Sequence, residues 1–181
     1  MSKQILFIQG GGEGGYEADK ELVTSLQAAL GEEYMISYPE MRWDEAAADF
    51  GWTKQIGEEI AQADNGLVLV GHSFGASMIL KYLSETTINK KIKGVFLLAA
   101  PFWSGDEAWK AGFKLKSDFA NSLPADVVYY LYHSKDDDEV PIFHFHQYKK
   151  KLARANFREV NSGAHQFGND LALVAEDIKS L

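Results

Sequence analysis

Short apolar runs alternate along the chain with longer stretches in which apolar residues recur at helical spacing. The apolar runs predict six strands, at residues 5–8, 34–38, 67–70, 93–99, 127–132 and 157–160. The helical spacing predicts helices at about residues 17–30, 53–63, 76–83, 142–153 and 169–180. Strands that alternate with helices favour an α/β fold, in which helices cover both faces of a parallel sheet. Such a doubly wound sheet binds ligands beyond the carboxyl ends of its strands.

The run at residues 67–70 leads directly into Gly71-His72-Ser73-Phe74-Gly75, a pentapeptide of the form G-x-S-x-G. A strand, a sharp turn and a helix form the context in which this motif presents a nucleophilic serine. The two glycines suit the turn because they lack a Cβ atom and let strand and helix approach closely. The motif therefore predicts Ser73 as a nucleophile. The alternative is a glycine-flanked turn with an incidental serine.

A serine hydroxyl becomes a good nucleophile only when a neighbouring base takes its proton, and histidine is the natural base. His165 lies in the loop between the last strand and the last helix, at the expected edge of the sheet. His72 is inside the pentapeptide, and His133 ends a strand, where a structural role is expected. His144 and His146 lie two residues apart on a predicted helix, so they would not share a face as metal ligands. His165 is therefore the candidate base, and no metal site is predicted.

An acid that orients the histidine should follow the strand at residues 127–132. Asp136, Asp137 and Asp138 lie there, next to Glu139. A run of acids is often a solvated loop, and EF-hand spacing is absent, so calcium is not expected. The functional interpretation is that one of the three aspartates turns toward His165, which gives the chain order serine, aspartate, histidine.

Acyl transfer builds negative charge on the former carbonyl oxygen, and fixed N–H donors must already point to it. The backbone N–H of Phe74, directly after the candidate nucleophile, is one expected donor. The glycines after the first strand allow a second donor to approach, and Gly11 is the first choice, with Gly12 next.

The same glycine-rich segment has a competing interpretation. Gly10, Gly12 and Gly15 satisfy a dinucleotide-binding fingerprint after a first strand, and Glu40 after the second strand would serve as the ribose acid. A nucleotide-binding oxidoreductase would leave the serine motif, the aspartates and the last histidine unexplained. The fingerprint is therefore the weaker interpretation, and no cofactor is predicted.

Two irregular stretches, residues 40–52 and 101–124, follow strands at the predicted active edge and are rich in aromatic residues. Their rings predict an apolar pocket for an acyl or alcohol group, or else packing between helices. The candidate substrate-binding residues are Trp43, Phe102, Trp103, Trp109 and Phe113. Lysines 110, 114 and 116 alternate with these rings and are interpreted as a solvated face.

Composition narrows the classes of function. The 181 residues suit one domain, residues 1–181, and 46% hydrophobic with 24% charged residues is typical of a globular protein. A net charge of −8 without a basic stripe argues against nucleic acid as a partner. Cysteine is absent, which excludes disulfides and thiolate chemistry. No apolar run approaches the ~20 residues that cross a bilayer, so a cytoplasmic protein is expected.

Taken together, these segments resemble the α/β-hydrolase superfamily, and most of all its small YdeN-like and retinoblastoma-binding-protein-9-like serine hydrolases. Four segments carry the resemblance: Phe7-Ile8-Gln9-Gly10-Gly11-Gly12, the pentapeptide at 71–75, Asp137-Asp138-Glu139-Val140-Pro141 and Gly163-Ala164-His165. The resemblance implies a minimal fold without a large cap and a strand order of 2-1-3-4-5-6. Gln9 departs from the family pattern, where histidine is common, and so does Ala164, where glycine is common.

The resemblance also implies the chemistry. Ser73 would be the nucleophile, His165 the base and Asp137, which begins the family's D-x-x-V-P pattern, the acid. Gly11 and Phe74 would supply the oxyanion hole. The implied activity is hydrolysis of a small carboxylic ester, thioester or amide through an acyl-enzyme. The alternative is a weakly active or inactive member of the fold that serves as a binding module.

Overall fold

The computed structural model describes residues 3–181 and contains a six-stranded parallel sheet with the order β2-β1-β3-β4-β5-β6. This confirms the predicted α/β fold and strand order. The strands are β1 (Lys3–Ile8), β2 (Tyr34–Ser37), β3 (Leu67–His72), β4 (Ile92–Leu98), β5 (Val128–Ser134) and β6 (Asn156–Val160).

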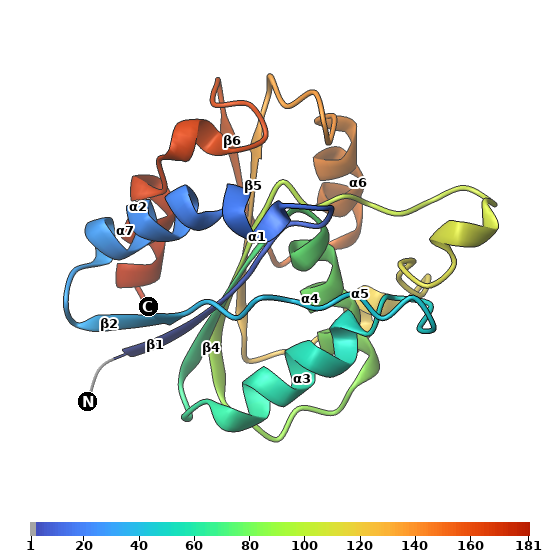
Figure 1. The fold of residues 1–181 in the computed structure, drawn as a ribbon, viewed down its shortest axis with the longest axis horizontal. Coiled ribbons are helices and arrows are strands. Elements are labelled where there is room, and N and C mark those ends of the chain that lie inside the picture. The colour runs from blue at the N-terminus through green and yellow to red at the C-terminus, as the bar shows by residue number, and fades with distance from the viewer. Residues whose placement is uncertain (1–2) are drawn as a thin grey trace.

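Helices cover both faces of this sheet (Figure 1). One face carries α1 (Gly15–Ala18), α2 (Lys20–Leu30) and α7 (Ala172–Lys179), and the other carries α3 (Trp52–Gln62), α4 (Ser73–Glu85) and α6 (Phe143–Lys151). Short helices occupy the connections: η1 (Ala108–Lys110), α5 (Phe119–Ser122) and η2 (Phe167–Asn169). Within residues 3–181, no helix is both long and apolar enough to cross a membrane.

Two hydrophobic layers hold the helices to the sheet. Leu22, Leu26 and Leu30 recur at helical spacing on α2 and are buried on one face. On the other face, Ile56 and Ile60 of α3 pack in the same way. Strand β3 is buried along its whole length because it lies between these layers and between β1 and β4. The nucleophile motif therefore follows the most enclosed part of the sheet.

The helix predicted at residues 17–30 is present as two elements, α1 and α2, which are separated by one residue. α1 ends at Ala18, α2 begins at Lys20, and the residue between them, Asp19, is only 1% exposed. Its carboxylate accepts a hydrogen bond from the backbone N–H of Gly10 at 2.7 Å. The backbone of Asp19 keeps helical angles and helical hydrogen bonds to Gly15 and Val23, so the chain continues from α1 into α2 while the carboxylate is satisfied by partners outside the helix.

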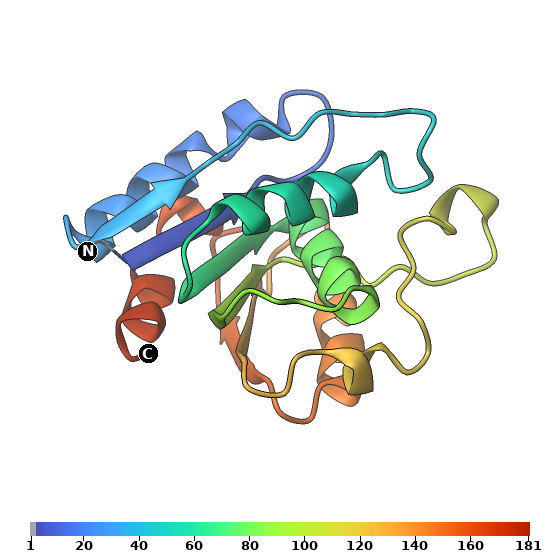
Figure 2. The ribbon, with the colours of Figure 1, turned by 90° about the horizontal axis from the view of Figure 1, so that it is seen from below.

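The two aromatic stretches lie on the same side of the molecule. The segments after β2 and after β4 both extend from the carboxyl edge of the sheet, as Figure 2 shows in cyan and yellow. The two segments are in contact, because the ring of Phe50 in the first lies 5.5 Å from the ring of Phe113 in the second, between centroids. Together they form a wall beside the end of β3.

Candidate active site

The turn that carries Ser73 is tight and strained. Strand β3 ends at His72 and α4 begins at Ser73 itself, whose φ of 50° lies in the left-handed region. Such a backbone costs roughly 1–3 kcal/mol and is typical of functional sites. A Cβ atom added at Gly75 would overlap the carbonyl oxygen of Gln9, so only glycine fits there. The motif thus forms the predicted nucleophile elbow geometry.

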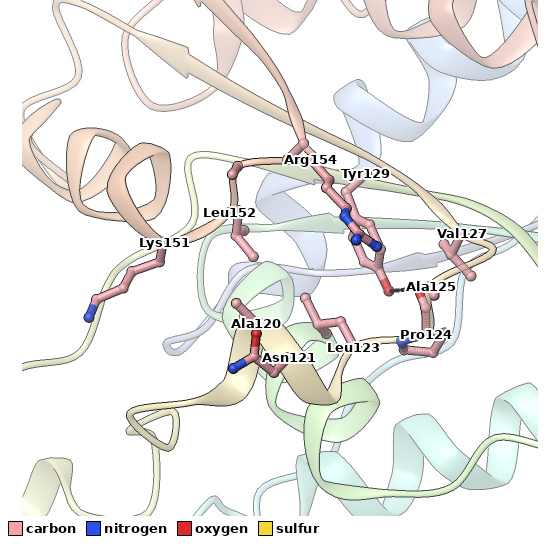
Figure 3. A pocket seen from close by; sticks show the side chains of 12 residues that line it. Ala120, Asn121, Leu123, Pro124, Ala125, Val127, Tyr129, Lys151, Leu152 and Arg154 are labelled. Atoms are coloured by element: carbon pink, nitrogen blue, oxygen red, sulfur yellow. Dashed lines mark hydrogen bonds between the residues drawn. The ribbon is translucent and has the colours of Figure 1, made fainter.

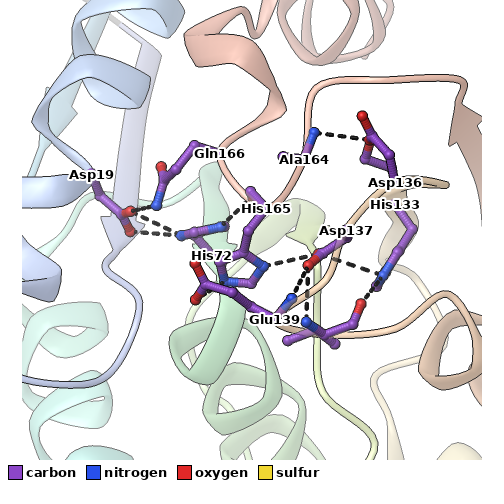
Figure 4. A network of polar contacts seen from close by, with 11 residues as sticks. Asp19, His72, His133, Asp136, Asp137, Glu139, Ala164, His165 and Gln166 are labelled. Atoms are coloured by element: carbon purple, nitrogen blue, oxygen red, sulfur yellow. Dashed lines mark hydrogen bonds and ion pairs between the residues drawn. The ribbon is translucent and has the colours of Figure 1, made fainter.

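One of the three neighbouring aspartates reaches the ring of His165. Figure 4 shows the Asp137 carboxylate beside this ring, with Oδ2 at 2.9 Å from Nδ1. The other oxygen, Oδ1, accepts hydrogen bonds from the backbone N–H groups of Glu139 and Val140, at 3.0 and 2.9 Å. Both residues of the pair are buried, with 5% and 6% of their surfaces exposed. This fixes the ring with its Nδ1–H toward Asp137 and leaves Nε2 as the basic nitrogen.

The surroundings keep Asp137 ionised. Burial alone would raise the pKa of its carboxyl, but the hydrogen bonds from His165 and from the Val140 backbone outweigh burial, and the pKa falls below its usual value. Burial lowers the pKa of His165, whereas the hydrogen bond and charge of Asp137, followed by the charge of Glu139, raise it above its usual value. An ionised partner that stabilises a protonated imidazole is what a general base needs when it takes a proton from serine.

Asp136 has a different position from Asp137. Its carboxylate accepts hydrogen bonds from the backbone N–H groups of Ala164 and Gly163, at 2.9 and 3.3 Å, and from the hydroxyl of Ser134. Ala164 has a φ of 51°, a conformation that glycine adopts at lower cost. Asp136 therefore holds the loop that carries the candidate base, and it compensates for an alanine where the family pattern has glycine.

Ser73 and His165 line the same cavity. Within residues 3–181, no hydrogen bond joins the Ser73 hydroxyl to the imidazole ring. Such contacts are often long before substrate binds and tighten in the complex. The structure thus brings His165 to the same cavity as Ser73. Nε2 of the ring, which does not face Asp137, is free to accept the serine proton.

The two expected oxyanion donors also meet at this cavity. Gly11 and Phe74 both line it, and a Cβ atom at Gly11 would come within 2.9 Å of the Phe74 side chain. Neither backbone N–H has a hydrogen-bond partner within residues 3–181. Gly10 and Gly11 therefore pack against the elbow, where a side chain at Gly11 would collide with Phe74.

The cavity has a volume of about 370 Å³ and is mainly aromatic. Its lining comprises Gly11, Gly12, Trp43, Phe50, Ser73, Phe74, Pro101, Trp103, Phe113, Glu139, Val140, His144 and His165. Trp43 stacks on Phe74 with ring centroids 5.8 Å apart. Trp103 is fixed by a hydrogen bond from its indole N–H to the hydroxyl of Ser77 at 3.0 Å. Three of the five predicted pocket aromatics, Trp43, Trp103 and Phe113, thus lie on its wall.

The other two predicted aromatics do not line the cavity. Phe102 turns toward α6 and packs edge-on against Tyr148, with ring centroids 5.1 Å apart. Trp109 is 62% exposed and lies behind Trp103, at 6.0 Å between ring centroids. Alternation of side chains along an extended segment explains Phe102, because its neighbour Trp103 faces the opposite way. Phe102 and Trp109 support the wall from outside.

Sequence reasoning missed Phe50, Pro101, Glu139, Val140 and His144 as cavity residues. The position of Phe50 in the aromatic stretch after β2 is a signal that could have found it. Glu139 and Val140 could have been found from their place two and three residues after Asp137. His144 gave no such signal, because its Nδ1 accepts a hydrogen bond from the backbone N–H of Phe102, which comes from a distant part of the chain.

His133, His144 and His146 lie in three different surroundings. His146 lies on the outer side of α6, near Glu159 at 3.8 Å, whereas His144 faces the cavity, so the two diverge as their spacing predicts. The His133 ring donates to the carbonyl oxygen of Val140 at 2.6 Å, which is the expected structural role. Residues 3–181 contain no cluster of three or more potential metal ligands.

A second cavity, of about 310 Å³, lies between α5, the start of β5 and the end of α6 (Figure 3). Its polar side chains include Asn121, Tyr129, Lys151 and Arg154. None of these is an activated nucleophile paired with a base.

Comparison with known proteins identifies the family. A family model described as serine hydrolase matches residues 21–168. The ydeN gene product from B. subtilis is 19% identical, with a TM-score of 0.69 over 99% of this chain and 98% of that chain. The thioesterase domain from the curacin biosynthetic pathway is 19% identical, with a TM-score of 0.75 over 98% and 91%. A bromoperoxidase from Bacillus anthracis is 14% identical, with a TM-score of 0.72 over 99% and 91%.

No curated protein matches the chain. At the low identities of the solved structures, likeness shows the fold alone, and that fold is the α/β-hydrolase fold. The family model covers most of the chain, including the elbow and both members of the Asp137–His165 pair. The chain belongs to the serine hydrolase family.

Proposed function

We propose that this serine hydrolase cleaves small carboxylic esters, thioesters or amides through an acyl-enzyme on Ser73. The observation that carries the proposal is the 2.9 Å contact between Asp137 and the His165 ring, on a cavity that also contains the strained Ser73. Ser73 and His165 come from two different loops and line one cavity, and Asp137, from a third loop, contacts the His165 ring. Their arrangement matches the requirements of acyl transfer.

Acylation begins when His165 Nε2 accepts the hydroxyl proton of Ser73 and the serine oxygen attacks the substrate carbonyl. The N–H groups of Gly11 and Phe74 stabilise the negative charge that forms on the carbonyl oxygen. Asp137 stabilises the imidazolium. The tetrahedral intermediate then collapses, and the leaving group departs with the proton from His165, which leaves the acyl group on Ser73.

Deacylation repeats these steps with water as the nucleophile. His165 accepts a proton from the water molecule, the resulting hydroxide attacks the acyl carbonyl, and the proton returns to the Ser73 oxygen as the acid leaves. No further group is needed for either half of the reaction.

The cavity wall favours an uncharged, apolar substrate group. A volume of about 370 Å³ suits a small molecule, and Trp43, Trp103 and Phe113 offer apolar surface beside Ser73. Glu139 is the acidic side chain in the lining, and none of the described lining residues is lysine or arginine. A substrate that carries a carboxylate near the scissile bond would be repelled.

A panel of esters and thioesters with increasing acyl length tests the proposal. Purified protein should turn over short and medium apolar acyl groups, with kcat/KM falling for carboxylate-bearing analogues of the same length. A pre-steady-state burst of alcohol release would indicate an acyl-enzyme whenever deacylation is slow. Labelling by a fluorophosphonate without turnover of any panel member would instead favour a binding module.

The pH profile of kcat/KM should fall on the acid side as His165 becomes protonated, because only the neutral ring accepts the serine proton. Since the pKa of His165 is raised, this limb should lie above that of an ordinary histidine. Glu139→Gln removes one of the negative charges that raise the pKa, so the limb should move to lower pH. Oε2 of Glu139 lies 3.9 Å from Nε2 of His165, and the Glu139 side chain is 70% exposed. Solvent therefore screens its charge, and the shift of the limb should be small.

The matched control for the pH profile is Asp138→Asn. Asp138 is an exposed neighbour and is not among the groups that shift His165, so its profile should coincide with that of the wild type. An acid limb that stays in place in Glu139→Gln, or that moves equally in Asp138→Asn, would contradict the charge assignment.

A further inference from the structure

A second Asp–His pair, Asp19 and His72, lies next to the candidate catalytic pair Asp137 and His165. Both oxygens of the Asp19 carboxylate lie 2.9 Å from Nδ1 of His72, and each of the two side chains is 1% exposed. The His72 ring lies 4.6 Å from the His165 ring between centroids. The proposed reaction uses neither Asp19 nor His72, although burying an ionisable pair is costly unless the pair is fully hydrogen-bonded.

The hydrogen-bond partners assign the protons on the two rings. His72 Nε2 lies 3.0 Å from the backbone carbonyl oxygen of His165, which can only accept, so this nitrogen carries a hydrogen. Nδ1 faces the Asp19 carboxylate, which also accepts from the Gly10 backbone and from the Gln166 amide. Both ring nitrogens of His72 therefore donate. His165 differs, because only its Nδ1 faces an acceptor at hydrogen-bond distance.

The carboxylate of Asp19 is suited to remain ionised. Burial alone would raise its pKa, but the hydrogen bond and charge of His72 and the hydrogen bonds from Gly10 and Gln166 outweigh burial and lower the pKa. Figure 4 shows Asp19, His72 and Gln166 as one group on the far side of His165 from Asp137. Asp19 lies at the junction of α1 and α2, with its side chain buried.

This group connects the loops on which the proposed reaction depends. Through Gly10, Asp19 fixes the residue next to Gly11, an expected oxyanion donor. Through His72, it fixes the residue directly before Ser73. The other end of the His72 ring holds the backbone of His165, and Gln166 ties the same loop to Asp19 from the side.

We propose that Asp19 and His72 form a positioning pair, in which the hydrogen bonds of the His72 ring and of the Asp19 carboxylate hold the oxyanion segment, the nucleophile elbow and the base loop in register. Neither residue touches substrate, and the inference rests on the proposed function of Ser73 and His165. Misplacing reacting groups by about 1 Å can cost on the order of 100-fold in rate. Loss of the pair should therefore lower kcat far more than it changes KM.

Asp19→Ala and Asp19→Asn separate positioning from general stability. Alanine removes every contact, and kcat should fall about 10- to 100-fold with little change in KM. Asparagine keeps the shape: its oxygen can accept from Gly10, and its amide can donate to His72 Nδ1. The buried Oε1 of Gln166, which has no hydrogen-bond partner, can accept from the same amide once Gln166 turns over. Asp19→Asn should therefore recover most of the lost kcat.

Asp177→Ala is the matched control. Asp177 is another buried aspartate, which accepts from the Tyr132 hydroxyl at 2.7 Å and from Arg158 at 2.9 and 3.1 Å, and it lies outside the cavity. This variant should lose thermal stability like Asp19→Ala but keep its kcat. A folded Asp19→Ala with the kcat of wild type, or an equal loss of kcat in Asp177→Ala, would overturn the proposal.

Nitrogen NMR of the histidine rings tests the pair in the wild-type protein, so it does not depend on how Asp19→Ala folds. His72 should show two ring N–H groups in the unmodified protein and one in Asp19→Asn. A single N–H on His72 in the wild type would overturn the assignment. Ser73→Ala in the same kinetic series separates the proposed function from the positioning role of Asp19 and His72. Full turnover in that variant would refute Ser73 as the nucleophile. The number of ring N–H groups on His72 would stand as a separate result.

Discussion

Replacing Ser73 by alanine is expected to lower kcat/KM for any accepted ester by at least about 10⁴-fold, because the residual activity of such a site comes only from the oxyanion hole and binding. The variant should also lose labelling by a fluorophosphonate probe. Folding should be preserved or improved, since the Ser73 hydroxyl makes no hydrogen bond within residues 3–181. The measurement pairs steady-state kinetics with thermal unfolding of the same preparation.

Ser84→Ala is a matched control for the nucleophile. Ser84 lies on the same helix, is buried, and donates its hydroxyl to the carbonyl oxygen of Lys81 at 3.1 Å, away from the cavity. Its activity and labelling should equal those of the wild type. If Ser73→Ala were still labelled and active, the hydroxyl at the elbow would not be the nucleophile.

Asp137→Asn is expected to lower kcat by about 10⁴-fold while leaving the fold intact. An asparagine amide at this position would donate to His165 Nδ1 and so place the ring hydrogen on Nε2. That tautomer cannot accept the proton of Ser73. The value of kcat should be measured across the pH range in which His165 titrates. A loss of kcat at every pH can then be distinguished from a shift of the pH profile.

The neighbouring aspartates provide internal controls. Asp138→Asn changes an exposed side chain and should behave as wild type. Asp136→Asn keeps a side chain that can still accept from Ala164, so its effect should be small and should come through the position of the base loop. Equal losses in all three variants would show that the acidic loop acts as a whole and that Asp137 has no special role.

Much of the architecture could be predicted from the sequence because parallel sheets have a strong pattern. Apolar runs of strand length alternate with helical spacing, and β3 is apolar along the stretch that leads into the elbow. Gly75 marked the tight turn, because a side chain there would overlap Gln9. The place of His165 after the last strand followed from the rule that ligands meet at the carboxyl edge.

Other features depend on distant contacts that no local pattern contains. Asp136, Asp137 and Asp138 are chemically identical, and the contact that distinguishes Asp137 is with His165, which lies 28 residues further along the chain. The hydrogen bonds of Asp19 are another example, since its partners Gly10, His72 and Gln166 come from three other segments.

The aromatic stretches illustrate a third limit. Composition predicted a pocket but could not say which rings face it, because residues 101–124 have no periodicity that assigns a side. Trp103 faces the cavity because its indole N–H finds the hydroxyl of Ser77, whereas Phe102 packs on Tyr148. To predict which way each ring points, one would need to know where α4 and α6 lie relative to residues 101–124.

The measurement that most directly tests the account is identification of the residue that carries the acyl group during turnover. Rapid acid quenching of enzyme mixed with a good ester substrate, followed by peptide mass spectrometry, should place the acyl mass on Ser73. The fraction acylated should fall when the ester is replaced by its hydrolysis product. An acyl group found on another residue, or turnover without any covalent intermediate under single-turnover conditions, would contradict the proposal that Ser73, His165 and Asp137 act together.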